Sequence, residues 1–179
     1  MTARVGPGTP RQIGPLGVLV SRAAGRQMGT APPNVFTTLG RHRRLFWRWL
    51  LFAGALMPGG RLPRIDTELV ILRTSHLCGC DYEWDHHERL GRRAGLAEAD
   101  VARVREGPDA PGWSERQRTL LRATDELVGS RRIADETWSG VERELPVVHR
   151  IELCMLAGHY AMLAGTLNSL GVERDGARA

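Results

Sequence analysis

Hydrophobic positions recur at the three-to-four-residue spacing of a helix over most of this 179-residue chain. No segment shows the strict alternation of apolar and polar residues that is typical of a half-buried strand. The predicted fold class is therefore all-α. Helices are expected over residues 18–28, 34–57, 79–94, 97–105, 114–129, 135–145 and 147–170, with a further helix beginning at Leu62-Pro63.

The boundaries of these helices follow from the residues that start and stop them. Gly14, Pro15 and Gly17 interrupt the first apolar segment and confine the prediction to residues 18–28. Residues 58–60, Pro-Gly-Gly, end the second helix, and Gly95 ends the helix over 79–94. The pair Ser114 and Gln117 is a capping box, which predicts that a helix begins there.

Two of the expected helices have apolar faces too broad for an exposed surface helix. The helix over 147–170 carries small and apolar residues on most faces and is predicted to be buried nearly all round. The helix over 34–57 has an equally broad apolar set, so we expect it to contact other chains. A single short chain cannot cover both faces, which favours an oligomer.

The length fits one domain, predicted as residues 11–179 after a flexible N-terminus of residues 1–10 that is rich in Gly, Pro and Thr. We expect no membrane span, because no apolar run reaches about 18 residues. A secretory signal is not expected either, and three cysteines do not make a disulfide framework. The predicted compartment is the cytoplasm.

The 25 basic residues are all arginine, and the formal net charge is +5. Nucleic acid is not an expected partner, because the arginines are spread along the chain in short runs. Arginine also binds carboxylates with two parallel hydrogen bonds. Arg73 is therefore a candidate for orienting an acidic small-molecule substrate.

Candidate chemistry is concentrated in residues 68–95. Cys80, Glu83 and His87 are three and four residues apart, so a helix over 79–94 would place them on one face. Glu68, at the start of an apolar segment, could direct its carboxylate to the same place. In a partly dry site such groups acquire separated pKa values, which acid/base catalysis at neutral pH requires.

Several of these residues also have simpler interpretations. Glu83 and His87 could be an exposed ion pair worth a few tenths of a kcal/mol. Glu83 and His86 form Glu-x-x-His, but the chain has no second copy, so no metal site is expected. Glu152 and His159 could be a second polar pair, although a buried, hydrogen-bonded histidine is the commoner case.

The order Glu68, eleven residues, Cys80, two residues, Glu83, three residues, His87 resembles the signature of the carboxymuconolactone decarboxylase and alkylhydroperoxidase-like superfamily. In its peroxidase branch a second cysteine stands where this chain has Glu83, and Tyr-Glu-Trp at residues 82–84 is the form of the decarboxylase-like branch. Further resemblance lies in residues 31–36, 60–63, 94–96, 152–153, 158–160, 167–168 and 170–172.

The resemblance implies an alkylhydroperoxidase-like helical bundle that forms a homotrimer or homohexamer and needs no cofactor. It further implies that His87 and Glu83 move a proton to or from a carbon next to a carbonyl, with Glu68 setting the charge of the histidine. Cys80 occupies the family's cysteine position. Tyr82 and Trp84 supply bulk that could bind substrate and exclude water.

Two alternatives remain open from the sequence. A thiol peroxidase or disulfide reductase would use Cys80 with Cys78, although one intervening glycine makes their disulfide geometrically awkward. A non-catalytic oligomeric binding protein would simply retain the residues of the family. The decarboxylase-like acid/base enzyme is the function that the sequence favours.

Overall fold

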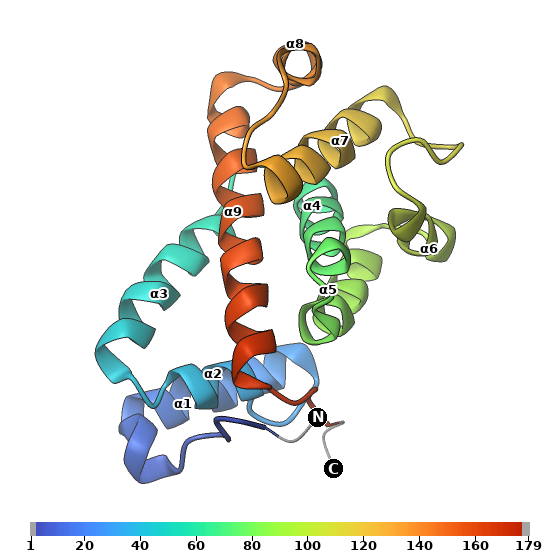
Figure 1. Ribbon diagram of the computed structural model, residues 1–179. Helices are drawn as coiled ribbons and strands as arrows, with labels where there is room; N and C mark the ends of the chain where they lie inside the picture. Colours follow the sequence, from blue (N-terminus) through green and yellow to red (C-terminus); the bar gives the residue numbers. More distant parts are fainter. Residues whose placement is uncertain (1–2, 177–179) are drawn as a thin grey trace. The chain divides into compact units, whose positions relative to one another are not determined.

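The computed structural model describes residues 3–176, and this part of the chain forms helices joined by turns, without a β-strand (Figure 1). The all-α prediction is confirmed. The described residues form two compact units, one of residues 3–55 together with residues 166–176, the other of residues 56–165. Among the described helices, none is long and apolar enough to cross a membrane. The domain boundaries at residues 11 and 179 stay a prediction.

The first unit contains α1 (Pro10–Met28), α2 (Asn34–Leu39) and α3 (Arg43–Leu56). Helix α1 begins earlier than the predicted residue 18, because Gly14 adopts φ 78° and lets two helical segments join across a kink. The prediction of one helix over 34–57 is wrong, since the chain turns at residues 40–42.

That turn has a packing consequence in the aromatic cluster of the first unit. The ring of Phe36 on α2 packs edge-on against Phe46 and Trp49 on α3, with centroid distances of 5.8 and 6.0 Å. Edge-to-face packing of this kind stabilises by about 0.5–1.5 kcal/mol per pair beyond area burial. The aromatic rings of α2 and α3 thus pack against each other across a break at Gly40, which the apolar pattern did not predict.

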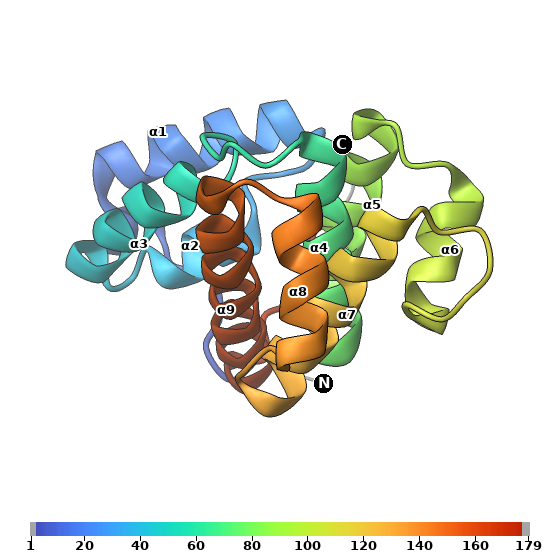
Figure 2. The same cartoon turned by 90° about the horizontal axis from the view of Figure 1, so that it is seen from above.

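The second unit is built around α4 (Arg64–Leu77), which packs against α5 (Asp81–Ala94), α6 (Glu98–Glu106) and α7 (Glu115–Ser130). Figures 1 and 2 show α4 beside α5 and α7, with α8 (Asp135–Glu144) next to α7. The ten residues from Asp66 to Ser75 are all buried. A helix surrounded in this way needs partners for its charged side chains, and those partners define the site.

Helix α9 (Val147–Leu170) has the predicted bounds. It begins in the second unit, and its Leu153, Leu156 and Ala157 are fully buried. The capping box of α7 is also confirmed, because the Ser114 hydroxyl accepts the backbone N–H of Gln117 at 3.2 Å. One face of α9 is not buried, contrary to the expectation of burial nearly all round, and it carries Ile151, Met155 and Met162.

Candidate active site

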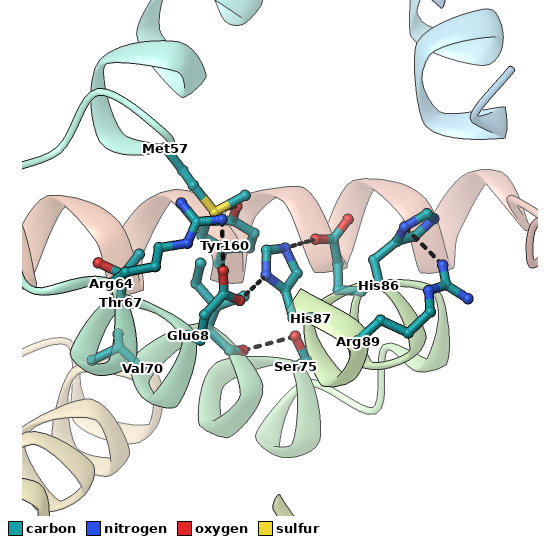
Figure 3. A network of polar contacts seen from close by, with 12 residues as sticks. Met57, Arg64, Thr67, Glu68, Val70, Ser75, His86, His87, Arg89 and Tyr160 are labelled. Atoms are coloured by element: carbon teal, nitrogen blue, oxygen red, sulfur yellow. Dashed lines mark hydrogen bonds and ion pairs between the residues drawn. The ribbon is translucent and has the colours of Figure 1, made fainter. Parts of the chain in front are cut away.

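A buried histidine lies between two carboxylates at the contact of α4 with α5 (Figure 3). His87 Nδ1 lies 2.6 Å from Glu68 Oε2, and His87 Nε2 lies 3.4 Å from Glu83 Oε2. The exposed fractions of Glu68, Glu83 and His87 are 0%, 5% and 3%. We call Glu68, His87 and Glu83 the relay. The short contact fixes the imidazole ring, and the longer one leaves the Nε2 side available.

The relay is assembled by close packing of two helices. Glu83 and His87 are one helical turn apart on α5, so their side chains lie on the same face. Gly91, one turn further along α5, also faces α4. A Cβ at this position would lie 2.9 Å from Leu96 Cδ1 and 3.6 Å from Glu68 Cβ. A side chain at Gly91 would crowd Leu96 and lie against Leu72 and Glu68 of α4, so the glycine suits the close packing of this region.

Arg64 closes the relay toward solvent. Its Nη2 lies 2.8 Å from Glu68 Oε1, and its side chain is 39% exposed while that of Glu68 is fully buried. Glu68 thus contacts a guanidinium through one oxygen and an imidazole through the other (Figure 3). An unpaired carboxylate at this depth would be costly, so Arg64 and His87 both stabilise its charge.

Helix α9 contributes Tyr160 to the same cluster. Its ring packs edge-on against His87, with a centroid distance of 5.1 Å and an interplanar angle of 89°. Its hydroxyl donates to Met57 Sδ at 3.8 Å. Burial is the first cause that raises the pKa of Tyr160, and the charges of Glu83 and Glu68 add to it. Tyr160 is therefore a neutral wall of the site at ordinary pH.

The electrostatics of the relay hold a proton on His87. Burial alone would lower its pKa, but the charges of Glu68 and Glu83 and the hydrogen bonds to both outweigh burial and raise the pKa to about 9. His87 is then an imidazolium at neutral pH. It donates from Nδ1 to Glu68 and from Nε2 toward Glu83, so the site can deliver a proton.

Cys80 lies beside the relay but not on the stripe that the sequence predicted. Helix α5 begins at Asp81 instead of residue 79, because Gly79 turns the chain with φ 58° and leaves Cys80 as the N-cap. Burial raises the pKa of the Cys80 thiol to about 12, with a contribution from the Glu83 charge that backbone hydrogen bonds from Glu83 and Tyr82 oppose. Within the described residues, neither Cys78 nor Cys80 takes part in a disulfide.

Arg73 does not point into the relay. Its Nε and Nη2 donate to the two carboxylate oxygens of Asp125 at 2.6 and 2.8 Å, and its Nη1 donates to the backbone oxygen of Val104 at 2.8 Å. These bonds connect α4 with α7 and with the end of α6. They give Arg73 a structural role, and its contact with a substrate stays a prediction.

The aromatic residues of α5 face other neighbours. The ring of Tyr82 packs against the imidazole of His86, with a centroid distance of 4.9 Å. The guanidinium carbon of Arg105 lies 4.1 Å from the centroid of the Trp84 ring. Both rings are buried. Contact of Tyr82 or Trp84 with a substrate stays a prediction.

Sequence reasoning missed Arg64 and Tyr160. Arg64 stands one helical turn before Glu68, a spacing that could have signalled an ion pair. Tyr160 lies in a segment noted for its family resemblance but carried no signal of contact with His87. Glu152 accepts the backbone N–H groups of Arg61 and Leu62 at 2.7 and 3.1 Å, which is the polar role that the structure gives it in place of a pairing with His159.

Within residues 3–176, no group of three or more His, Cys, Asp and Glu side chains is placed to hold a metal ion. The Nδ1 atom of His86, the histidine of the Glu-x-x-His pattern, lies 3.2 Å from the guanidinium of Arg89 instead (Figure 3). A cation next to that nitrogen disfavours a second cation there.

Comparison with protein families agrees with this geometry. The model of the carboxymuconolactone decarboxylase family matches residues 43–126, which include Glu68, Cys80, Glu83 and His87. This match and the fold together support the carboxymuconolactone decarboxylase and alkylhydroperoxidase-like superfamily. The family resemblance of the sequence is thereby confirmed. Among curated proteins, none matches the chain.

Solved structures share the fold at low identity. The debrominase Bmp8, crystallised as a cysteine-to-alanine variant with 2,3,4-tribromopyrrole, is 17% identical with a TM-score of 0.83 over 99% of this chain and 94% of that one. The alkylhydroperoxidase AhpD core of a peroxidase-related protein from Ralstonia eutropha is 17% identical, with a TM-score of 0.81 over 95% and 92%. A peroxidase-related protein from Silicibacter is 13% identical, with a TM-score of 0.81 over 96% and 92%. At these identities the similarity establishes the fold.

Proposed function

We propose that this protein is a cofactor-independent acid/base enzyme that acts on a small carboxylated or carbonyl-containing substrate in a decarboxylase-like reaction. The observation that carries the proposal is the unequal pair of contacts of His87. Glu68 holds Nδ1 at 2.6 Å, while the 3.4 Å contact to Glu83 leaves the Nε2 proton free to move.

In the proposed reaction the carbon–carbon bond to a carboxylate breaks, carbon dioxide leaves, and the electron pair remains on the substrate as an enolate. His87 is charged at neutral pH, so its Nε2 proton passes to the carbanion carbon, directly or through Glu83. The neutral imidazole then regains a proton from water. Glu68 keeps the ring oriented throughout and stabilises its charged form.

The thiol enzyme is the second candidate. The helix N-terminus at Cys80 and its backbone hydrogen bonds favour a thiolate, and the related debrominase was studied as a cysteine variant. Against it stands the pKa of about 12, which leaves Cys80 protonated at neutral pH. A peroxide cycle would also need a disulfide between Cys80 and Cys78 across one glycine.

A panel of 3-oxo acids and unsaturated lactone acids, assayed for carbon dioxide release, tests the acid/base proposal. We expect His87→Gln and Glu83→Gln each to lower kcat about 100-fold or more, because each removes a proton-transfer group. Cys80→Ser should keep most of the activity. Glu88→Gln is the matched control, since Glu88 lies on α5 and pairs with Arg92 at the surface.

Two outcomes would contradict the proposal. Near-wild-type turnover in either relay variant means that the relay does not carry the proton. Rapid reduction of peroxide with a dithiol, lost in Cys80→Ser, would establish the thiol enzyme instead. Circular dichroism of each variant separates loss of activity from loss of fold.

A further inference from the structure

His159 lies next to the relay on the inner side of α9. It is 5% exposed, and its imidazole packs edge-on against Tyr160 with a centroid distance of 5.2 Å and an angle of 86°. Tyr160 in turn packs edge-on against His87 at 5.1 Å. The two imidazoles therefore contact the same phenol ring, one from α9 and one from α5.

His159 belongs to the Glu83 end of the relay. The charge that acts on its imidazole is that of Glu83, whereas Tyr160 is affected by Glu83, Glu68 and Arg64 together. Glu83 is thus the ion-pair partner of His87 on its own helix, and its charge also acts on the imidazole of His159 on α9. The Glu68 end, by contrast, is closed by Arg64.

The two histidines differ in protonation. The pKa of His87 is raised to about 9, so His87 is charged at pH 7. Burial lowers the pKa of His159, and the Glu83 charge opposes this only in part, so His159 is neutral. Groups whose environments separate their pKa values in this way are suited to act as an acid and a base in one reaction.

We propose that His159 is a second acid/base residue of this site, the base that complements the His87 acid across Glu83, and that the pair equips the protein to isomerise β,γ-unsaturated carbonyl compounds. The inference rests on the proposed acid/base function and extends it. Decarboxylation needs only a proton donor, whereas moving a double bond needs a base and an acid together.

The steps balance without a co-reactant. His159 takes a proton from the carbon between the carbonyl and the double bond, and the electron pair of that C–H bond forms a dienolate. The imidazolium of His87 gives a proton to the γ-carbon, which completes the conjugated isomer. Glu83 accepts the proton from His159 and returns it to His87, so each residue regains its initial state.

The first test needs no substrate. NMR titration of the histidine ring protons should give His159 a pKa below its ordinary value of about 6.5 and His87 a pKa near 9. Glu83→Gln should lower the pKa of both residues, because the Glu83 charge raises both. An unchanged pKa of His159 in this variant would show that His159 does not face Glu83 and would overturn the inference.

The second test uses α-angelica lactone, a β,γ-unsaturated lactone, with conversion to the conjugated lactone followed by NMR in D₂O. We expect His159→Gln to slow isomerisation about 100-fold and to remove the loss of rate on the acidic side of the pH profile. The loss near pH 9, which comes from His87, should remain. His149→Gln, on the same helix, should behave like wild type.

Failure of this inference and failure of the proposed function are distinguishable. If His87→Gln abolishes carbon dioxide release while wild type does not isomerise the lactone, or while His159→Gln isomerises it at the wild-type rate, only the role of His159 falls. If the relay variants keep full decarboxylase activity, the proposed function falls and the inference with it. Loss in His159→Gln with an unchanged pKa of His87 supports the inference, because a merely structural defect would disturb the relay.

Discussion

The proton on His87 connects the stability of this protein with pH. Its pKa in the folded chain is about 9, above the reference value of 6.5. The stabilisation is therefore complete below about pH 6.5 and is lost as the pH rises through about 9. Above that pH, Glu68 and Glu83 flank a neutral ring, and the charge that stabilised both carboxylates is gone.

We expect the free energy of unfolding to fall between pH 6.5 and pH 9.5 in the wild type and to fall less in His87→Gln. Urea unfolding at one-unit pH intervals measures this difference. Burial also raises the pKa of Cys80 and of the other two thiols, which adds a loss of stability at high pH, but the variant shares that loss. Parallel pH curves for the two proteins would contradict the raised pKa of His87.

At the same scale, spacing identified some site residues and missed others. Glu83 and His87 were predictable because residues four apart on a helix always share a face. For Arg73, nothing local reveals the contact with Asp125, 52 residues further along the chain. Its guanidinium has one set of donors, and the Asp125 carboxylate and backbone oxygens occupy them.

Among the elements, the connection before α4 depends on α9. Glu152 accepts two backbone N–H groups of that connection, and Gly60 lies so close to the Glu152 carboxylate that a Cβ could not fit. The connection leads directly to Arg64, so this contact fixes the start of the helix that carries Glu68. A hydrogen bond to a charged acceptor contributes about 1.5–3 kcal/mol to the free energy of unfolding.

We therefore expect Glu152→Ala to lower the free energy of unfolding by about 2 kcal/mol, because two N–H groups lose their acceptor. Glu142→Ala is the control, since Glu142 lies at the surface and pairs with Arg150. Chemical denaturation of both variants beside the wild type gives the comparison. Equal stability of the two variants would mean that the contact of Glu152 does not hold the connection.

For the whole molecule, exposed apolar side chains agree with the predicted oligomer. Leu16 and Leu19 on α1, Leu51 on α3, and Ile151 and Met162 on α9 are each more than half exposed. Large apolar side chains gathered on helix faces commonly mark protein interfaces. A homotrimer or homohexamer remains the prediction, because the family resemblance implies it.

Light scattering at micromolar concentration should show a trimer or a larger assembly. Ile151→Glu together with Met162→Glu should weaken that assembly, because two charges would then have to be buried on α9. Arg132→Glu, at an exposed position beyond α7, is the control and should leave the mass unchanged. A wild-type monomer at this concentration would contradict the prediction.

The sequence by itself determined the helical class, the family and the stripe that contains Glu83 and His87. These follow from periodicity and short spacings, which act within one helix and need no knowledge of packing. Periodicity and spacing did not predict the break at residues 40–42 or the N-cap position of Cys80. At both places the chain turns within an apolar pattern that continues on either side.

Only the tertiary structure decided what surrounds His87. Glu68, which the sequence could only direct toward the site, lies 19 residues before His87 on a different helix, and Tyr160, which packs against His87, comes from α9. Their effects on the imidazole depend on contacts of a few ångströms and on exclusion of water, because charges act strongly only at short range and low dielectric. Which carboxylate meets which cation is settled by how the helices pack.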